Sequence, residues 1–127
     1  AYGVSVGGTY VEISINQQHM WYYKNGKLVV ETDVVTGNYG TNDTPKGAYS
    51  IIYKASPATL MLNSHVTFWL PFTSDGCGIH DASWRSSWEY GGTRYKGHGS
   101  HGCVNTPYNA AKKIYNNISS GTRVVVY

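Results

Sequence analysis

The stretch that sets the interpretation of this chain is Gly97-His98-Gly99-Ser100-His101-Gly102-Cys103-Val104-Asn105, followed by Thr106-Pro107. Glycines alternate here with two histidines, a serine and a cysteine. Glycine at this density predicts a sharply bent backbone, because glycine alone adopts positive φ without steric cost. A purely structural loop rarely needs so many nucleophilic and basic side chains. We therefore predict that Cys103 is a nucleophile presented on a tight turn.

A helix is predicted directly after this turn. Thr106 suits the N-cap position and Pro107 suits the first helical position. Gly121 stands where a helix of about three turns would stop. The apolar residues between them follow helical spacing: Ala111, Ile114, Tyr115 and Ile118.

The rest of the chain reads mostly as β-structure. Asn25-Gly26 between the strand-like runs 19–24 and 27–35 predicts a β-hairpin, because both turn residues need positive φ. Further strands are predicted at 10–15, 48–54, 66–72, 78–80 and 122–127, whereas 36–47 is a loop and 55–65 is ambiguous. We expect a single domain over residues 1–127, mainly β: a β-sandwich or partly open barrel of mixed sheets. One C-terminal α-helix follows the catalytic turn.

Composition limits the possible functions. A chain of 127 residues is most economically one domain. The formal charge of +3 comes from scattered lysines and arginines, so nucleic-acid binding has little support. No apolar run approaches the roughly 20 residues of a membrane span, and the N-terminus lacks a signal-peptide pattern, so any signal or anchor is expected to be removed or to lie upstream. The 12 Tyr and 4 Trp against 2 Phe suit exposed grooves, although a β-rich core is an equal explanation.

A catalytic cysteine needs a base, because the thiolate is the nucleophile and a free thiol ionises near pH 8.5. His101 and His98 are near Cys103 in sequence, and His80 would approach from the end of its own strand. A separation of two residues on a tight turn restricts how the His101 ring can point, so we favour His80 as the base. The backbone N–H groups of the Gly102–Cys103 turn are candidates for an oxyanion hole.

Other interpretations use the same residues. Cys77-x-x-His80 with His101-x-Cys103 contains the ligand types of a structural zinc site, although the second pair is more tightly spaced than usual. A disulfide between Cys77 and Cys103 is a further alternative in an oxidising compartment. We expect Cys77 to be a buried and inert thiol.

Residues 81–97 form a long segment without periodicity, between the two catalytic candidates. A loop of this length is usually functional, often as a lid. Its aromatic side chains could form walls, and an arginine could pair with a substrate carboxylate. The predicted substrate-binding residues are Trp84, Arg85, Tyr90 and Arg94 from this loop, together with Asn105. Packing of the loop is the simpler explanation for any single one of them.

Gly78-Ile79-His80, followed by Ser100-His101-Gly102-Cys103-Val104-Asn105, resembles the catalytic signature of the L,D-transpeptidases, the YkuD-type peptidoglycan cross-linking domains. The resemblance covers essentially the whole chain, including Thr44-Pro45-Lys46-Gly47, which is similar to the family's Thr-Pro-x-Gly loop. Asp81 and Asn105 stand where many members have glycine and arginine, and both variants resemble a Gram-positive branch.

The resemblance implies a two-step acyl transfer. Cys103 would be the nucleophile, His80 would accept and donate the proton, and Ser100, His101 and Gly102 would form the signature turn. A backbone carbonyl, Ser100 or Asp81 could orient His80. The implied partners are peptidoglycan stem peptides as donor and acceptor, with carbapenems as covalent inhibitors. The implied reaction needs no metal and no organic cofactor. We expect a monomer that works outside the cytoplasmic membrane at the cell wall. An L,D-carboxypeptidase or a non-catalytic peptidoglycan-binding module are the alternatives.

Overall fold

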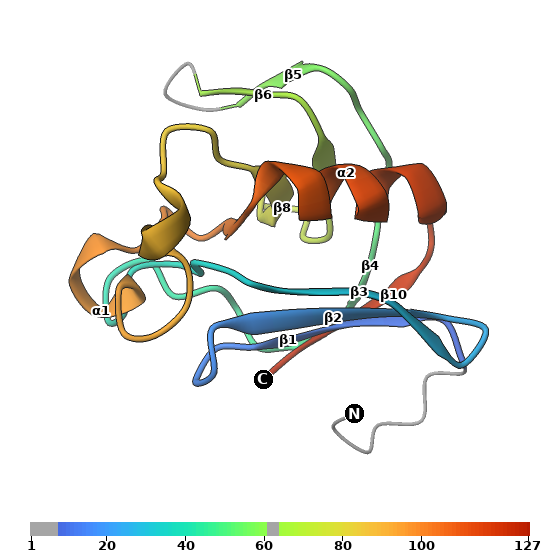
Figure 1. The fold of residues 1–127 in the computed structure, drawn as a ribbon, viewed down its shortest axis with the longest axis horizontal. Coiled ribbons are helices and arrows are strands. Elements are labelled where there is room, and N and C mark those ends of the chain that lie inside the picture. Colours follow the sequence, from blue (N-terminus) through green and yellow to red (C-terminus); the bar gives the residue numbers. More distant parts are fainter. Residues whose placement is uncertain (1–7, 61–63) are drawn as a thin grey trace.

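A five-stranded mixed sheet forms the base of the fold in the computed structural model, which describes residues 8–60 and 64–127 (Figure 1). Its strand order is β3 (Lys27–Asp33), β2 (His19–Lys24), β1 (Tyr10–Ser14), β10 (Arg123–Val126) and β4 (Gly47–Ser50). Strand β10, the last in the sequence, lies inside the sheet between β1 and β4 and pairs parallel with β1. All other neighbouring strands of this sheet are antiparallel.

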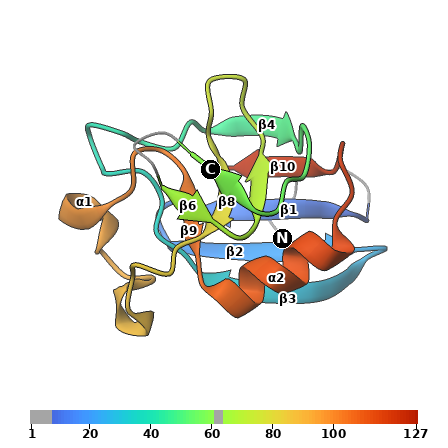
Figure 2. The same cartoon turned by 90° about the horizontal axis from the view of Figure 1, so that it is seen from above.

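A smaller sheet and the main helix lie side by side over one face of this base (Figure 2). The small sheet has the order β7 (Trp69–Pro71), β8 (Gly78–Asp81) and β9 (Val104–Thr106), and β8 pairs parallel with β9. Helix α2 (Tyr108–Asn117) contacts both β3 and β8. A two-stranded hairpin of β5 (Ala58–Thr59) and β6 (His65–Val66) lies beyond the small sheet.

The core fills the space between these layers. Val11 and Ile13 of β1 and Met20 of β2 are fully buried, and Ile79 of β8 and Ile114 of α2 belong to the same apolar cluster. Alternation along β2 places every second side chain inward, as the period of a half-buried strand requires. The prediction of a mainly β fold, a sandwich or partly open barrel of mixed sheets with one C-terminal helix, is confirmed, and over the described residues the sheets do not close into a barrel.

Local turn chemistry behaves as the sequence predicts at the β2–β3 hairpin. Asn25 and Gly26 have φ of 54° and 80°, the left-handed values that a two-residue hairpin turn needs. The pairing shifts register between Tyr22 and Tyr23, where a bulge increases the local twist.

The helix start differs from the prediction. Thr106 belongs to β9 and bonds the Val104 carbonyl through Oγ1 at 3.1 Å, so Pro107 takes the N-cap position instead. The three residues of β9 and Pro107 therefore separate Cys103 from helix α2. The helix ends at Asn117, well before Gly121. The parallel partner β8 explains this difference, because pairing with it draws residues 104–106 into the sheet.

Several strands are shorter than expected. The run predicted at 48–54 ends after residue 50, and the run at 66–72 divides into parts of β6 and β7. The segment 81–97 contains a 3₁₀ turn, η2 (Ser87–Glu89), and the first residues of α1 (Tyr95–His98), which periodicity did not predict. Short turns of this kind carry too few residues for a periodic signal.

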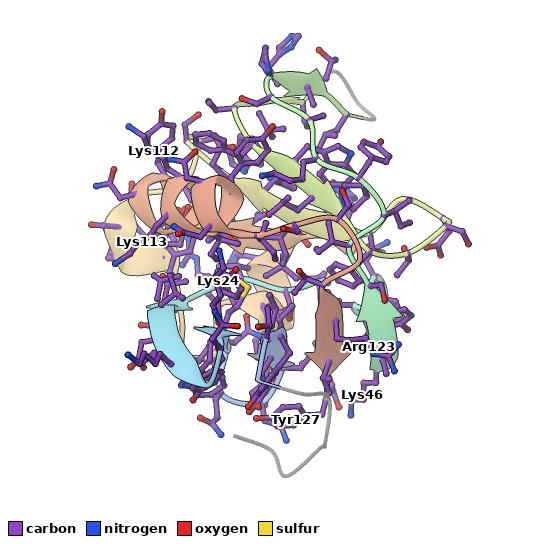
Figure 3. All side chains as sticks on the ribbon, turned by 90° about the vertical axis from the view of Figure 1, so that its right-hand side faces the viewer. Lys24, Lys46, Lys112, Lys113, Arg123 and Tyr127 are labelled. Atoms are coloured by element: carbon purple, nitrogen blue, oxygen red, sulfur yellow. The ribbon has the colours of Figure 1, made fainter. Side chains whose placement is uncertain are left out.

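Charged side chains are distributed over separate elements (Figure 3). Lys24 projects from β2 towards α2, where its Nζ donates to the Asn117 carbonyl at 3.0 Å, and Tyr22 Oη donates to the same oxygen. These bonds satisfy a carbonyl at the helix C-terminus. In the described ranges, no helix is both long and apolar enough to cross a membrane.

Candidate active site

The parallel pairing of β8 with β9 brings the two halves of the predicted site together. Ile79 lies opposite Val104 and His80 lies opposite Asn105. Cys103, which directly precedes β9, therefore lies beside the start of β8. Its Sγ donates a long hydrogen bond of 3.5 Å to the Gly76 carbonyl.

A cavity of about 720 Å³ opens over this junction. The residues that line it include His80 from the first half of the predicted site and Ser100, His101 and Cys103 from the second half. The other residues in its wall are Asn42, Tyr53, Thr59, Leu60, Ser64, Trp69, Asp75, Gly76, Cys77, Trp84, Arg85, Gly99 and Asn105. This volume is within the usual range of small-molecule sites.

His80 is held in one orientation. Its side chain is buried, and Nδ1 lies 2.6 Å from the backbone carbonyl of Asp81. A carbonyl oxygen can only accept, so Nδ1 carries the proton and Nε2 has the free lone pair of a base. The rings of Trp69 and Trp84 lie 5.9 and 5.8 Å from the imidazole. Burial lowers the pKa of His80, with the Asp81 carbonyl opposing this effect, so the neutral base is favoured.

Of the three groups considered for orienting His80, the backbone carbonyl of Asp81 makes the contact. The Asp81 carboxylate has another role, because it accepts hydrogen bonds from the backbone N–H groups of Thr67 and Phe68 at 2.9 and 2.8 Å. These bonds fix the connection that leads into β7. Asp81 therefore orients His80 through its main chain, while the charge of its carboxylate also favours the protonated imidazole.

Cys103 is a protonated thiol in this environment. Burial, with smaller contributions from Cys77 and Asp75, raises its pKa to about 11, although a hydrogen bond from the Gly78 backbone opposes the shift. A thiol with this pKa is almost entirely un-ionised at neutral pH. Nucleophilic attack therefore requires a base that removes the proton during the reaction, and His80 lines the same cavity.

The turn before Cys103 is braced from inside. Ser100 Oγ donates to the Cys103 carbonyl and accepts from the Gly102 N–H at 3.1 Å. Gly102 has φ of 126°, and a Cβ there would lie 3.2 Å from the Cys77 sulfur, so both backbone and space favour glycine. The Gly102 amide, a candidate oxyanion donor, is thus engaged by the serine hydroxyl.

Thr44 supports the same turn from the loop 36–47, which sequence reasoning linked to the site only by resemblance. It is buried, and its Oγ1 donates to the Gly102 carbonyl at 2.7 Å and accepts from the Gly37 N–H at 2.9 Å. The loop also pairs along the motif, because the Ser100 N–H donates to the Thr36 carbonyl at 3.0 Å. The sequence signal for this role was a threonine before a proline in a glycine-rich loop. This signal does not indicate which distant residues the threonine contacts.

Replacing Thr44 with valine is expected to destabilise the protein by about 2–4 kcal/mol, because it leaves the Gly37 N–H and the Gly102 carbonyl unpaired inside the protein. Urea unfolding with a common m-value measures this change. Thr41 offers a matched control, since its hydroxyl bonds Asn38 at the surface. Thr41→Val should change stability by less than about 0.5 kcal/mol. Equal effects of the two variants would contradict the assigned role of Thr44.

The predicted substrate-binding residues divide into two groups. Trp84, which is 54% exposed, lines the cavity together with Arg85 and the buried Asn105. Tyr90 and Arg94 are absent from the described cavity wall: Tyr90 Oη donates to the Ala82 carbonyl at 3.0 Å, and Arg94 pairs with Glu89 at 3.5 Å. These last two side chains hold the loop together.

The alternative interpretations of the cysteines and histidines find no geometric support. Cys77 and Cys103 are both free thiols. Over residues 8–60 and 64–127, no group of three or more His, Cys, Asp or Glu side chains converges as metal ligands would. Cys77 is half-buried and lines the cavity, so the prediction that it is buried was wrong. Burial nevertheless raises the pKa of its thiol.

One known protein family matches nearly the whole length of the chain. A family model described as YkuD, the L,D-transpeptidase catalytic domain, matches residues 8–126. Among curated proteins, no significant match is found.

Solved structures give the same result. A crystal structure of an Enterococcus faecium L,D-transpeptidase with cysteine mutated to serine is 41% identical, with a TM-score of 0.90 over 96% of this chain and 50% of that one. The Ldtfm–avibactam carbamoyl enzyme is 41% identical, with a TM-score of 0.91 over 96% of this chain and 49% of that one. The NMR structure of the E. faecium catalytic domain is 39% identical, with a TM-score of 0.82 over 98% of this chain and 100% of that one.

The chain spans about half the length of the cysteine-to-serine mutant and of the avibactam carbamoyl enzyme, and all of the domain studied by NMR. The expected resemblance to the Gram-positive branch is confirmed by these E. faecium structures. With the family model covering residues 8–126 and the signature residues meeting at one cavity, the chain belongs to the YkuD family of L,D-transpeptidase catalytic domains.

Proposed function

We propose that this domain cross-links peptidoglycan stem peptides by acyl transfer through Cys103, outside the cytoplasmic membrane. The observation that carries the proposal is the shared cavity of Cys103 and His80, with His80 held by the Asp81 carbonyl in the tautomer of a base. Membership of the L,D-transpeptidase family supports the same chemistry.

In the first step, His80 Nε2 takes the Cys103 proton while the sulfur attacks the carbonyl carbon of the third, L-configured residue of a tetrapeptide stem. The tetrahedral intermediate collapses to a thioester as the bond to the terminal D-alanine breaks, and His80 returns the proton to the leaving amine. For the Gly102 amide to stabilise the oxyanion, it must exchange the Ser100 hydroxyl for the substrate oxygen.

In the second step, a side-chain amine of another stem attacks the thioester and loses its proton to His80. The products are a 3→3 cross-link and the regenerated thiol. Water in place of the amine would release a tripeptide, which is the carboxypeptidase reaction. Structures of relatives acylated by ertapenem or carbamoylated by avibactam support carbapenems and other acylating reagents as covalent inhibitors of this site.

Incubation of the protein with disaccharide-tetrapeptide tests the proposal. We expect released D-alanine and a dimer that lacks one D-alanine, both identified by mass spectrometry. Tripeptide without dimer would assign the carboxypeptidase reaction instead. A folded protein that releases no D-alanine from any tetrapeptide stem would contradict the proposal.

A further inference from the structure

Two fully charged side chains contribute to the described cavity wall, and they flank the strand that carries His80. Asp75 precedes β8 and Arg85 follows it. The Asp75 carboxylate accepts from Thr73 Oγ1, and its negative charge contributes to the raised pKa of Cys103. The cavity wall therefore carries both signs of charge, and a negatively charged group is favoured beside Arg85 and disfavoured beside Asp75.

The Arg85 guanidinium is held by neutral acceptors. With the Asn105 amide oxygen facing it, this oxygen accepts from Nε at 2.8 Å and from Nη2 at 3.2 Å. Nη2 also donates to the His98 carbonyl at 2.9 Å. Asn105 is 2% exposed, so the buried amide fixes the plane of the guanidinium. These bonds engage Nε and Nη2 and leave Nη1 as the donor group for a ligand.

The positive charge of Arg85 is not neutralised by a direct ion pair. Within the described parts of the chain, no carboxylate lies within ion-pair distance of it. Glu89 acts on Arg85 only from a distance, since its carboxylate contacts Arg94 and the Ser86 N–H. Arg94 differs, because it has Glu89 as its partner and lies over the Trp88 ring at 4.7 Å.

We propose that Arg85 binds a carboxylate of the acyl donor and that Asn105 positions its guanidinium for this contact. The inference rests on the proposed function for the identity of the donor. The Arg85 guanidinium is half-buried in the cavity wall and is held in place by uncharged acceptors. It can therefore form charge-assisted hydrogen bonds to a carboxylate with little reorganisation. Stem tetrapeptides can supply this carboxylate from the terminal D-alanine or from the glutamate residue, and Arg85 distinguishes either from its amide.

The test uses one synthetic tetrapeptide stem in three forms: with both carboxylates free, with the terminal D-alanine amidated, and with the glutamate amidated. Arg85→Gln should lower kcat/KM for the fully free form about 10- to 100-fold, mainly through KM. It should leave the form that lacks the recognised carboxylate within about twofold of the unsubstituted enzyme. The amidation that abolishes the effect identifies the source of the carboxylate. Arg94→Gln is the matched control and should preserve the preference.

Asn105→Asp separates positioning from folding. The new carboxylate has nearly the same shape and would keep the guanidinium in place, but it would neutralise the charge. We expect this variant to lose the preference for the carboxylate form while its unfolding midpoint stays close to that of the unsubstituted protein. If Arg85→Gln lowered activity equally for all three peptide forms, Arg85 would only stabilise its loop. That result would overturn the proposal.

Binding measurements separate this inference from the proposed function. Calorimetric titration of the three peptides into Cys103→Ala protein measures carboxylate recognition without turnover. An affinity difference between free and amidated forms that disappears with Arg85→Gln would support the inference even if the enzyme released no D-alanine. Equal affinities for all forms, or no binding of any form, would overturn it.

Discussion

Cys103→Ala is expected to reduce D-alanine release and dimer formation by more than about 10⁴-fold, because it removes the atom that forms the thioester. The fold should remain intact. The Cys103 sulfur donates a long hydrogen bond to the Gly76 carbonyl and accepts one from the Gly78 backbone, so replacing it with a methyl group removes little packing. Discontinuous assay of D-alanine from disaccharide-tetrapeptide measures the effect.

Cys77→Ala provides the matched control, since Cys77 lines the same cavity and is also a free thiol. It should retain activity within about fivefold, because its thiol has no role in the proposed steps. If Cys77→Ala abolished turnover and Cys103→Ala did not, the nucleophile would be misassigned. Circular dichroism of both variants would establish that each is folded.

His80→Gln is expected to lower the rate of acylation about 10²- to 10⁴-fold, the usual contribution of a general base. The shape of the pH profile should change as well. Burial lowers the pKa of His80 below its ordinary value of 6.5, so acylation of the unsubstituted protein should persist below pH 6.5 and fall only on further acidification.

Without His80, the reaction must begin from thiolate that forms on its own. Because the pKa of Cys103 is raised to about 11, the His80→Gln rate should increase about tenfold per pH unit through the neutral range and level off near that value. Stopped-flow acylation by a β-lactam across pH measures both profiles. His98→Gln, with an exposed ring, serves as the control. A flat profile in His80→Gln would show that another group is the base.

The sequence predicts the parts of this fold that local chemistry decides. Asn25-Gly26 specifies its hairpin through positive φ, and the spacing of Ala111 and Ile114 specifies α2. The predicted ends of helices and strands are wrong where a residue distant in sequence pairs with the segment. Thr106 has the residue type of an N-cap, yet pairing with Asp81 across the small sheet places it in a strand.

In the candidate site too, the sequence predicts residues that a local motif marks and misses contacts between distant segments. Cys103 and His80 are identifiable because a dense motif of nucleophile, base and glycine is rare without a chemical reason. Thr44 reaches the motif over 58 positions of sequence, and no local pattern reports a contact of that range. The link between Arg85 and Asn105 is also tertiary, so the sequence could name both residues as candidates for substrate binding but could not say that one holds the other.

Intact mass spectrometry with ertapenem tests whether Cys103 is the acyl-accepting nucleophile of this cavity. A relative was solved in the acylated form with this carbapenem. We predict that the protein gains the mass of one ertapenem, that peptide mapping places the adduct on Cys103, and that Cys103→Ala shows no gain while Cys77→Ala is fully modified. An unmodified protein after prolonged incubation, or an adduct that persists in Cys103→Ala, would show that Cys103 is not the nucleophile.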